Sequence, residues 1–235
     1  MSPLNTLPIA VAGATGRMGN MLIEAILATD DCRLSGALDI PASPALGQDA
    51  SAFLGKASGV SVVSDLKAGL KDSGFLIDFT RPEGTLAHLK VCRELGVKAV
   101  IGTTGFTDAQ KAEIAEIAQD IAIVMAPNMS VGVNVTLKLL QMAAQALSTG
   151  YDIEIIEAHH ATKVDSPSGT AVRTAELMLA SRGELGPVAA PHVDQRARGQ
   201  QVSSIPIHSL RMHGVVAKQD VILGGTGELL TISHE

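Results

Sequence analysis

Aromatic side chains are scarce in this sequence, so large rings cannot dominate its core. Phe, Tyr and Trp make up 2% of the 235 residues, and Trp is absent. The core must then consist mainly of Ala, Val, Ile and Leu, which suits helices packed on a buried parallel sheet. Hydrophobic residues account for 46% and charged residues for 18%, a globular composition that excludes a disordered chain.

An excess of basic residues is also lacking. The formal net charge is -6 at pH 7, whereas a general nucleic-acid binder needs a basic surface to displace counterions. We therefore expect no nucleic-acid partner. Any anionic ligand must be bound by a local cluster of positive charge.

Cysteines are few, and long apolar runs are missing. Cys32 and Cys92 have no CxxC spacing and no neighbouring His, so we expect two buried, reduced thiols and no metal site. No apolar run approaches the roughly 18 residues that cross a membrane. The N-terminal MSPLNTLPIAVAG lacks the basic region of a signal peptide. We expect a cytoplasmic protein with no membrane partner.

Short apolar strands alternate with helical segments in the first half of the chain. Pro82 is suited to the first turn of a helix that Gly96 ends, and Thr107 with Gln110 resembles a capping box. Residues 40–60 form a loosely patterned connection. This alternation predicts an α/β fold, a Rossmann-type doubly wound parallel sheet. Strands are expected at 8–13, 32–39, 75–80, 98–105 and 121–128, and helices at 16–29, 82–96 and 108–119.

The second half lacks this alternation and predicts a C-terminal α+β domain with a mixed or antiparallel open sheet. A polar stretch at 182–203 precedes three consecutive strands, and a glycine-rich turn at 224–227 joins the last two. We place the boundary near residues 129–130, with a dinucleotide-binding domain at 1–129 and a substrate-binding, oligomerising domain at 130–235. Helices are expected at 131–148 and 168–180, and strands at 152–160, 204–212, 215–225 and 229–235.

A glycine-rich turn follows the first expected strand and opens the first helix. Its spacing is GxxGxxG, from Gly13 to Gly19, and Asp39 stands 20 residues beyond, at the end of the second strand. Such a turn brings backbone amides close to a pyrophosphate, and an acidic residue at this point binds ribose hydroxyls. A tight turn that needs glycine only for packing is the alternative. The context favours a dinucleotide cofactor.

The residues around Asp39 bear on the choice of cofactor. Its carboxylate would repel a 2′-phosphate, and neighbouring Ile40 supplies no positive charge. Only Arg17, in the glycine turn, is available to meet such a phosphate, and a solvated arginine is an equal alternative. We expect NADH to be favoured, with NADPH also accepted. The strand-end loops at 102–104 and 126–129 fall where a doubly wound sheet binds its ligand, although ordinary turns would look the same.

The segment EAHHATKVDSPSGTA, residues 157–171, gathers groups that suit an acid. If Ser166 caps a helix that begins at Pro167, the next three amides are left unpaired, which favours a carboxylate. Lys163 adds a full positive charge, and His159 and His160 can bind an anion or transfer a proton. An exposed loop with a surface lysine is the alternative. The cluster indicates a site for a small acid with more than one carboxylate. The other five histidines have no evident partner.

The same segment resembles the signature of the dihydrodipicolinate reductases, E-x-H-H-x-x-K-x-D-x-P-S-G-T-A, at every fixed position. GATGRMG, IDFTRPEGT, VIGTTGF and APNMSVGVN extend the resemblance over nearly the whole chain. It implies an oxidoreductase that reduces 4-hydroxy-tetrahydrodipicolinate with NAD(P)H in lysine biosynthesis through diaminopimelate. It also implies a homotetramer assembled by the strand-rich segment 203–235.

Site residues follow from this resemblance by position. His159 is the expected proton donor and Lys163 the second, and hydride comes from the nicotinamide. The substrate would be held by His160, Ser168, Gly169 and Thr170. The cofactor would be held by Gly13, Ala14, Thr15, Gly16, Arg17, Met18, Asp39, Gly102, Thr103, Thr104, Ala126, Pro127, Asn128 and Met129.

Some positions depart from the family. Ala161 and Thr162 replace a pair that is often basic, so we expect weaker substrate attraction, and Ile40 replaces an Arg that some members use for NADPH. The family's C-terminal return helix is expected to be absent. Two other functions stay open at this point: a different Rossmann dehydrogenase acting on an amino or hydroxy acid, and a non-catalytic NAD(P)-binding sensor.

Overall fold

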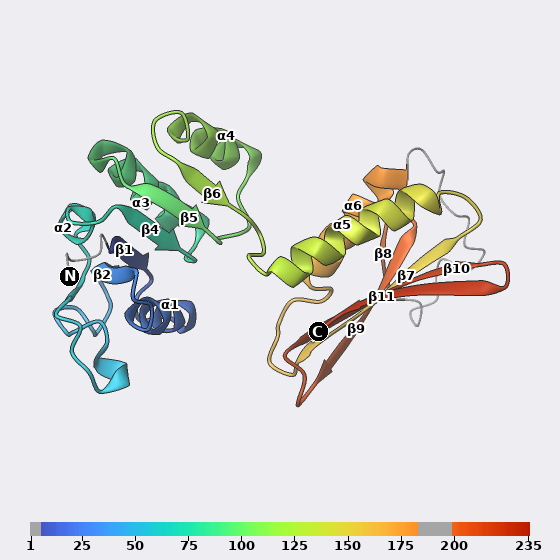
Figure 1. Cartoon of the computed structure of the whole chain (residues 1–235), viewed down its shortest axis with the longest axis horizontal. Coiled ribbons are helices and arrows are strands. Elements are labelled where there is room, and N and C mark those ends of the chain that lie inside the picture. The colour runs from blue at the N-terminus through green and yellow to red at the C-terminus, as the bar shows by residue number, and fades with distance from the viewer. Residues whose placement is uncertain (1–5, 183–198) are drawn as a thin grey trace. The chain divides into compact units, whose positions relative to one another are not determined.

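The first half of the chain folds around a six-stranded parallel sheet of order β3-β2-β1-β4-β5-β6 (Figure 1). The computed structural model describes residues 6–182 and 199–235, and the chain divides into two units, Met1–Pro127 and Asn128–Glu235. Strands are β1 (Leu7–Ala12), β2 (Cys32–Leu38), β3 (Val62–Val63), β4 (Phe75–Asp78), β5 (Lys98–Ile101) and β6 (Ile123–Met125). Helices are α1 (Arg17–Leu27), the 3₁₀ helix η1 (Ala52–Leu54), α2 (Leu66–Leu70), α3 (Pro82–Leu95) and α4 (Asp108–Ile117).

Buried side chains cover both faces of this sheet. Along β1, Ala10 and Ala12 belong to one core cluster while Ile9 and Val11 belong to another, as the alternation of side chains in a strand requires. The first cluster includes residues of α3 and α4, and the second includes residues of α1. The predicted doubly wound parallel sheet is confirmed.

Local signals placed two of the helices correctly. Thr107 accepts from the amide of Gln110, whose side chain in turn accepts from the amide of Thr107, so the predicted capping box is present at α4. Pro82 occupies the first turn of α3, and Gly96 ends that helix with a left-handed φ of 72°. Without a Cβ, Gly96 adopts this conformation at little steric cost.

The second unit contains a five-stranded mixed sheet of order β11-β10-β7-β9-β8. The β7–β9 pair is parallel, and the other pairs are antiparallel. This confirms the predicted open sheet. Its strands are β7 (Asp152–His160), β8 (Gln200–Val202), β9 (Ile205–Met212), β10 (Ala217–Gly225) and β11 (Glu228–His234), and its helices are α5 (Val131–Ala146) and α6 (Gly169–Arg182).

Both helices of the second unit pack on one face of its sheet. Leu140 of α5 and Met178 of α6 are fully buried against Ile153 and Ile155 of β7 and Leu223 of β10. Side chains on a strand alternate between faces, so this contact commits one face of β7 to the core. Beyond the core, the same face of β7 continues with the polar residues Glu157 and His159.

Several elements were not predicted. β3, α2 and β8 span only two, five and three residues, which is too short for a periodic pattern to emerge. Residues 183–198 of the expected polar stretch, with His192, lie outside the described residues. Cys92 is buried as expected, but Cys32 is partly exposed. Within residues 6–182 and 199–235, no helix combines the length and apolar character of a transmembrane segment.

Candidate active site

The glycine turn of the first unit joins β1 directly to α1. Gly13 has a φ of 66°, and a Cβ added there would lie 3.0 Å from Thr80 Cγ2. A Cβ on Gly19 would lie 2.1 Å from the Gly13 carbonyl oxygen, so α1 packs against the turn more closely than any side chain allows. Gly16 is the N-cap of α1 and no side chain caps the helix. The start of α1 therefore presents backbone amides, as an anion site requires.

Asp39 lies beside this turn, as the spacing indicated. Its Oδ2 accepts hydrogen bonds from the Thr15 amide (3.1 Å) and from the Thr15 hydroxyl. Its Oδ1 accepts from the amide of Ile40 at 2.8 Å, and the Ile40 side chain is 65% exposed. The Asp39 carboxylate is thus fixed next to the glycine turn, and the adjacent Ile40 side chain is apolar and exposed to solvent.

Thr103 and Gly102 lie in the loop after β5, and both are tightly packed. A Cβ on Gly102 would lie 1.9 Å from Phe79 Cε1. The buried Thr103 hydroxyl accepts from Thr85 Oγ1 at 3.0 Å and donates to Asp78 Oδ1 at 3.4 Å. β1 lies between β2 and β4, so the chain changes direction here and the loops after β1, β4 and β5 meet at one edge.

Asp78 anchors this edge and was not predicted. It is buried at the end of β4, and it accepts from the amide and hydroxyl of Thr80 and from His88 Nδ1 at 2.7 Å. Burial opposes ionisation, but these hydrogen bonds and the charge of His88 outweigh it and lower the pKa of Asp78. A single Asp inside an apolar strand carries no sequence signal for such a network.

The loop after β6 contains the last group of expected cofactor residues. The Ala126 amide donates to the Ile101 carbonyl at 3.1 Å, which ties the loop to β5. Asn128 Oδ1 accepts from the Ser130 amide at 2.9 Å, so its side chain is held at the start of α5. Thr104, Arg17 and Met18 are exposed.

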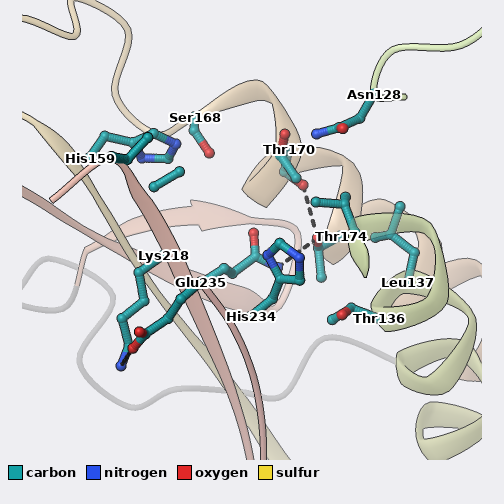
Figure 2. Close-up of a pocket in the computed structure, with 14 residues that line it drawn as sticks. Asn128, Thr136, Leu137, His159, Ser168, Thr170, Thr174, Lys218, His234 and Glu235 are labelled. Atoms are coloured by element: carbon teal, nitrogen blue, oxygen red, sulfur yellow. Dashed lines mark hydrogen bonds and ion pairs between the residues drawn. The ribbon is translucent and has the colours of Figure 1, made fainter. Parts of the chain in front are cut away.

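A cavity of about 220 Å³ lies in the second unit between its helices and the ends of its strands (Figure 2). Four predicted site residues line it: Asn128, His159, Ser168 and Thr170. Residues that were not predicted contribute the rest of its polar surface, namely Thr136, Thr174, Lys218, Gln219, His234 and Glu235. His234, one of the five histidines without an evident partner in the sequence, is among the lining residues.

Glu157 contacts two of the residues that line this cavity, His159 and Ser168. Its carboxylate is completely buried and contacts His159 Nδ1 at 2.6 Å, Arg211 Nη1 and Nη2 at 2.8 and 2.9 Å, and the Ser168 amide at 3.1 Å. Desolvation raises its pKa, but hydrogen bonds from Arg211, Ser209, His159 and Ser168 together lower it to about 2. An ionised carboxylate only accepts hydrogen bonds, so His159 donates from Nδ1 and its Nε2 is left for a ligand.

The start of α6 differs from the prediction. Ser168, and not Ser166, caps the helix, because its Oγ accepts from the Ala171 amide at 3.2 Å and the helix begins at Gly169. The Ser168 amide is already bound to the Glu157 carboxylate and the Gly169 amide acts on the Asp165 carboxylate, so a ligand carboxylate would have to replace Asp165 at Gly169. A Cβ on Gly169 would meet nothing within 4 Å, so the space beside it is open.

Lys163 and His160 do not line the cavity. Lys163 Nζ forms an ion pair with Asp165 Oδ1 at 2.7 Å. That ammonium group, with a smaller contribution from the Gly169 amide, lowers the pKa of Asp165. His160 bonds to Thr162 Oγ1 through Nδ1 at 2.8 Å, and alternation along β7 directs it to the face opposite His159. The carboxylate of Asp165 therefore occupies Lys163 and the Gly169 amide, two of the groups expected to bind the substrate.

Comparison with known proteins gives consistent matches over both units. The family described as dihydrodipicolinate reductase, N-terminus, matches residues 7–129, and the one described as its C-terminus matches residues 132–235. A 4-hydroxy-tetrahydrodipicolinate reductase of Herminiimonas arsenicoxydans is 56% identical over 99% of this chain and 87% of its own length. Its counterpart in Cupriavidus pinatubonensis is 56% identical over 97% and 86%.

A solved structure is similar as well. It is a dipicolinate-bound dihydrodipicolinate reductase from Paenisporosarcina sp. TG-14, with a TM-score of 0.80 and 31% identity, covering 98% of this chain and 88% of that one. An amine dehydrogenase from Mycobacterium smegmatis shares the fold alone, at a TM-score of 0.64 and 14% identity.

Proposed function

Because this chain belongs to the dihydrodipicolinate reductase family, we propose that it reduces 4-hydroxy-tetrahydrodipicolinate to tetrahydrodipicolinate with a nicotinamide cofactor. This reaction is a step of the diaminopimelate route to lysine. One observation carries the assignment: His159 faces a cavity with its Nδ1 fixed by Glu157, beside the open start of α6. An imidazole next to a helix end that presents backbone amides suits proton transfer to a substrate that carries a carboxylate.

A nicotinamide dinucleotide fits the first unit. The amides at the start of α1 suit its pyrophosphate, and Asp39 suits the hydroxyls of its adenosine ribose. When bound, the reduced cofactor supplies hydride. Thr15 holds the Asp39 carboxylate in this structure and would share it with the ribose. Since Ile40 adds no positive charge for a 2′-phosphate, NADH is the favoured cofactor and NADPH the secondary one.

The substrate is a dicarboxylate, and two groups are suited to its charges. Lys163 and the Gly169 amide both act on the carboxylate of Asp165, which supports their joint ability to bind a substrate carboxylate in exchange. Ser168 and Thr170 line the cavity at the same helix end. His160 would reach the substrate only after leaving Thr162, so we assign it a binding role that follows the family signature.

His159 is the proposed proton donor. Its Nε2 is the free ring nitrogen, and Glu157 stabilises the protonated ring through Nδ1. The substrate would lose its 4-hydroxyl group as water, hydride would add to the ring carbon that carried it, and the proton would go to the neighbouring ring carbon. Lys163 is the proposed second proton donor, a role it can take once substrate replaces Asp165 as its partner.

We further propose that the second unit assembles a homotetramer through its sheet. Large apolar side chains are exposed on two of its strands, Leu210 and Met212 on β9 and Leu229 and Leu230 on β11. Exposed apolar surface of this kind is typical of an interface. Light scattering after size exclusion would measure the mass directly, and a monomer would refute this part of the proposal.

A coupled assay tests the reaction itself. Freshly generated 4-hydroxy-tetrahydrodipicolinate is mixed with this chain, and oxidation of NADH or NADPH is followed. Aspartate semialdehyde and homoserine serve as substrates for the competing dehydrogenase hypothesis. Turnover confined to the cyclic dicarboxylate supports the proposal, whereas equal turnover of the others, or cofactor binding without any turnover, contradicts it.

A further inference from the structure

A buried carboxylate, that of Glu157, contacts the proposed proton donor His159. Along β7, Ile153, Ile155, Glu157 and His159 share one face, because side chains alternate along a strand. The two isoleucines belong to the core. Glu157 follows them and is 0% exposed, although a lone carboxylate at such a position is strongly disfavoured. Its burial therefore requires strong compensation.

Arg211 makes the largest single contribution to that compensation. It lies opposite His159 in the β7–β9 ladder, and its two terminal nitrogens form a fork on the two oxygens of Glu157 at 2.8 and 2.9 Å. Bidentate pairs of this kind are strong and orient both partners. Arg211 Nη2 also donates to the Asp165 carbonyl at 2.6 Å, so the same side chain holds the loop that carries Lys163.

Two further hydrogen bonds of Glu157 go to two parts of the site. Oε2 accepts from His159 Nδ1 at 2.6 Å, and Oε1 accepts from the Ser168 amide at 3.1 Å. One side chain thus contacts both the proton donor and the residue that caps α6. It therefore links His159 to the first residues of α6.

We propose that Glu157, held by Arg211, is a positioning residue that fixes the Nδ1–H tautomer of His159 and the start of α6 together. The proposal rests on the assigned reduction. Glu157 is not among the residues that line the cavity, and it acts through His159 and Ser168, which are. Losing its charge should misorient the imidazole, whereas losing the arginine fork should loosen the carboxylate-binding loop.

Other charged groups near His159 are relevant to this test. From the strands these are Arg211 of β9, Lys218 of β10, His234 of β11 and the terminal Glu235, and from the loop Lys163 with Asp165. Within the described residues that line the cavity, α5 and α6 contribute hydroxyl and apolar side chains only. None of these groups contacts Nδ1 of His159 in the structure. A change in the tautomer of His159 would therefore indicate a change in its contact with Glu157.

The decisive variant is Glu157→Gln, which keeps the shape and removes the charge. Its amide nitrogen can donate to Nδ1, which would switch His159 to the Nε2–H form. We expect kcat to fall about 10²-fold or more, as for other carboxylate–histidine pairs, with little change in KM for NADH. The ¹⁵N spectrum of the neutral ring of His159 should show the switch, assigned against His159→Gln among the seven histidines.

Glu154→Gln is the matched control. Glu154 contacts His208 Nε2 at 2.6 Å in the same strand pair, and neither residue lines the cavity. Its substitution also removes a carboxylate from a histidine, but it should leave kcat and the His159 signals unchanged. If Glu157→Gln behaves like this control while the wild type turns over substrate, the inference is wrong. A wild type without turnover would instead refute the assigned reaction.

Arg211→Lys provides a second test that does not depend on the first variant folding. Lysine keeps the charge beside Glu157 but cannot form the fork or reach the Asp165 carbonyl at the same time. We expect the Nδ1–H tautomer to persist and KM for the dicarboxylate to rise about 10-fold, the effect of one lost hydrogen bond to a charged group. Unchanged KM and kcat in this variant would overturn the inference.

Discussion

Asp78 and His88 form a buried pair in the first unit: Asp78 Oδ2 lies 2.7 Å from His88 Nδ1, and the carboxylate is 1% exposed. The two residues are ten positions apart, one ending β4 and the other on α3. Asp78 also binds the Thr80 and Thr103 hydroxyls. The pair therefore ties together the loops at the edge where the cofactor is proposed to bind.

Asp78→Asn should lower the free energy of unfolding. It should also make that free energy fall less as the pH is lowered. The pKa of Asp78 is lowered in the folded state, so its stabilising contribution is present above its unfolded pKa, near ~3.9, and is lost as pH falls through the folded value. At neutral pH we expect unfolding to become easier by about 1–3 kcal/mol, because buried donors lose their acceptor.

Urea unfolding between pH 3 and pH 7 measures this effect. Asp108→Asn is the control, since Asp108 is 99% exposed and forms only an ion pair with Lys111 three residues away. Equal stability of the Asp78 variant and this control at pH 7 would show that the buried network contributes nothing.

His159→Gln and Lys163→Ala should each slow the reaction while leaving NADH binding little changed. Removing a general acid typically costs about 10²–10⁴-fold in rate. Steady-state kinetics give kcat, and fluorescence titration gives the NADH dissociation constant. His208→Gln and Lys111→Ala are matched substitutions away from the cavity. Normal turnover in both test variants would end the catalytic assignment.

Ile40→Arg should shift cofactor preference toward NADPH. The side chain is exposed next to Asp39, where a guanidinium group can reach a 2′-phosphate. The ratio of kcat/KM for the two cofactors is the measurement. Leu95→Arg adds the same charge at the C-terminal end of α3 and should leave the ratio unaltered. No shift in the first variant argues against placing Asp39 at the ribose.

Gly169→Ala should weaken substrate binding without loss of stability. A Cβ there meets no protein atom within 4 Å, and alanine favours a helix over glycine by about 0.5–1 kcal/mol. The methyl group would instead occupy the space beside the first amides of α6, where the substrate carboxylate is proposed to bind. We expect KM for the dicarboxylate to rise about 10-fold or more, the cost of one charge-assisted hydrogen bond.

KM for NADH serves as the internal control for this variant, and thermal unfolding checks the fold. A lower melting temperature together with unchanged KM would mean that Gly169 is needed for packing and not for ligand access.

Local patterns predicted much of the first unit. The capping box at Thr107 and the end of α3 at Gly96 are formed by neighbouring residues, so a single short stretch contains all the necessary information. The glycine turn and Asp39 were likewise predictable, because strand–turn–helix geometry repeats in dinucleotide-binding folds. The cap of α6 was mispredicted because Ser166 and Ser168 are equally good caps by residue type. In the folded chain Ser168 caps the helix, and its own amide donates a buried hydrogen bond to Glu157.

The sequence by itself determined the alternation of strands and helices, the glycine turn with its acidic partner, and the segment that contains His159 and Lys163. Only the tertiary structure decided which residues meet at the cavity. Arg211 reaches Glu157 across 54 positions, and Gln219 reaches Thr174 across 45. Such contacts depend on strand order and register, which bring distant residues together after the sheet has formed. No periodicity along the chain records them.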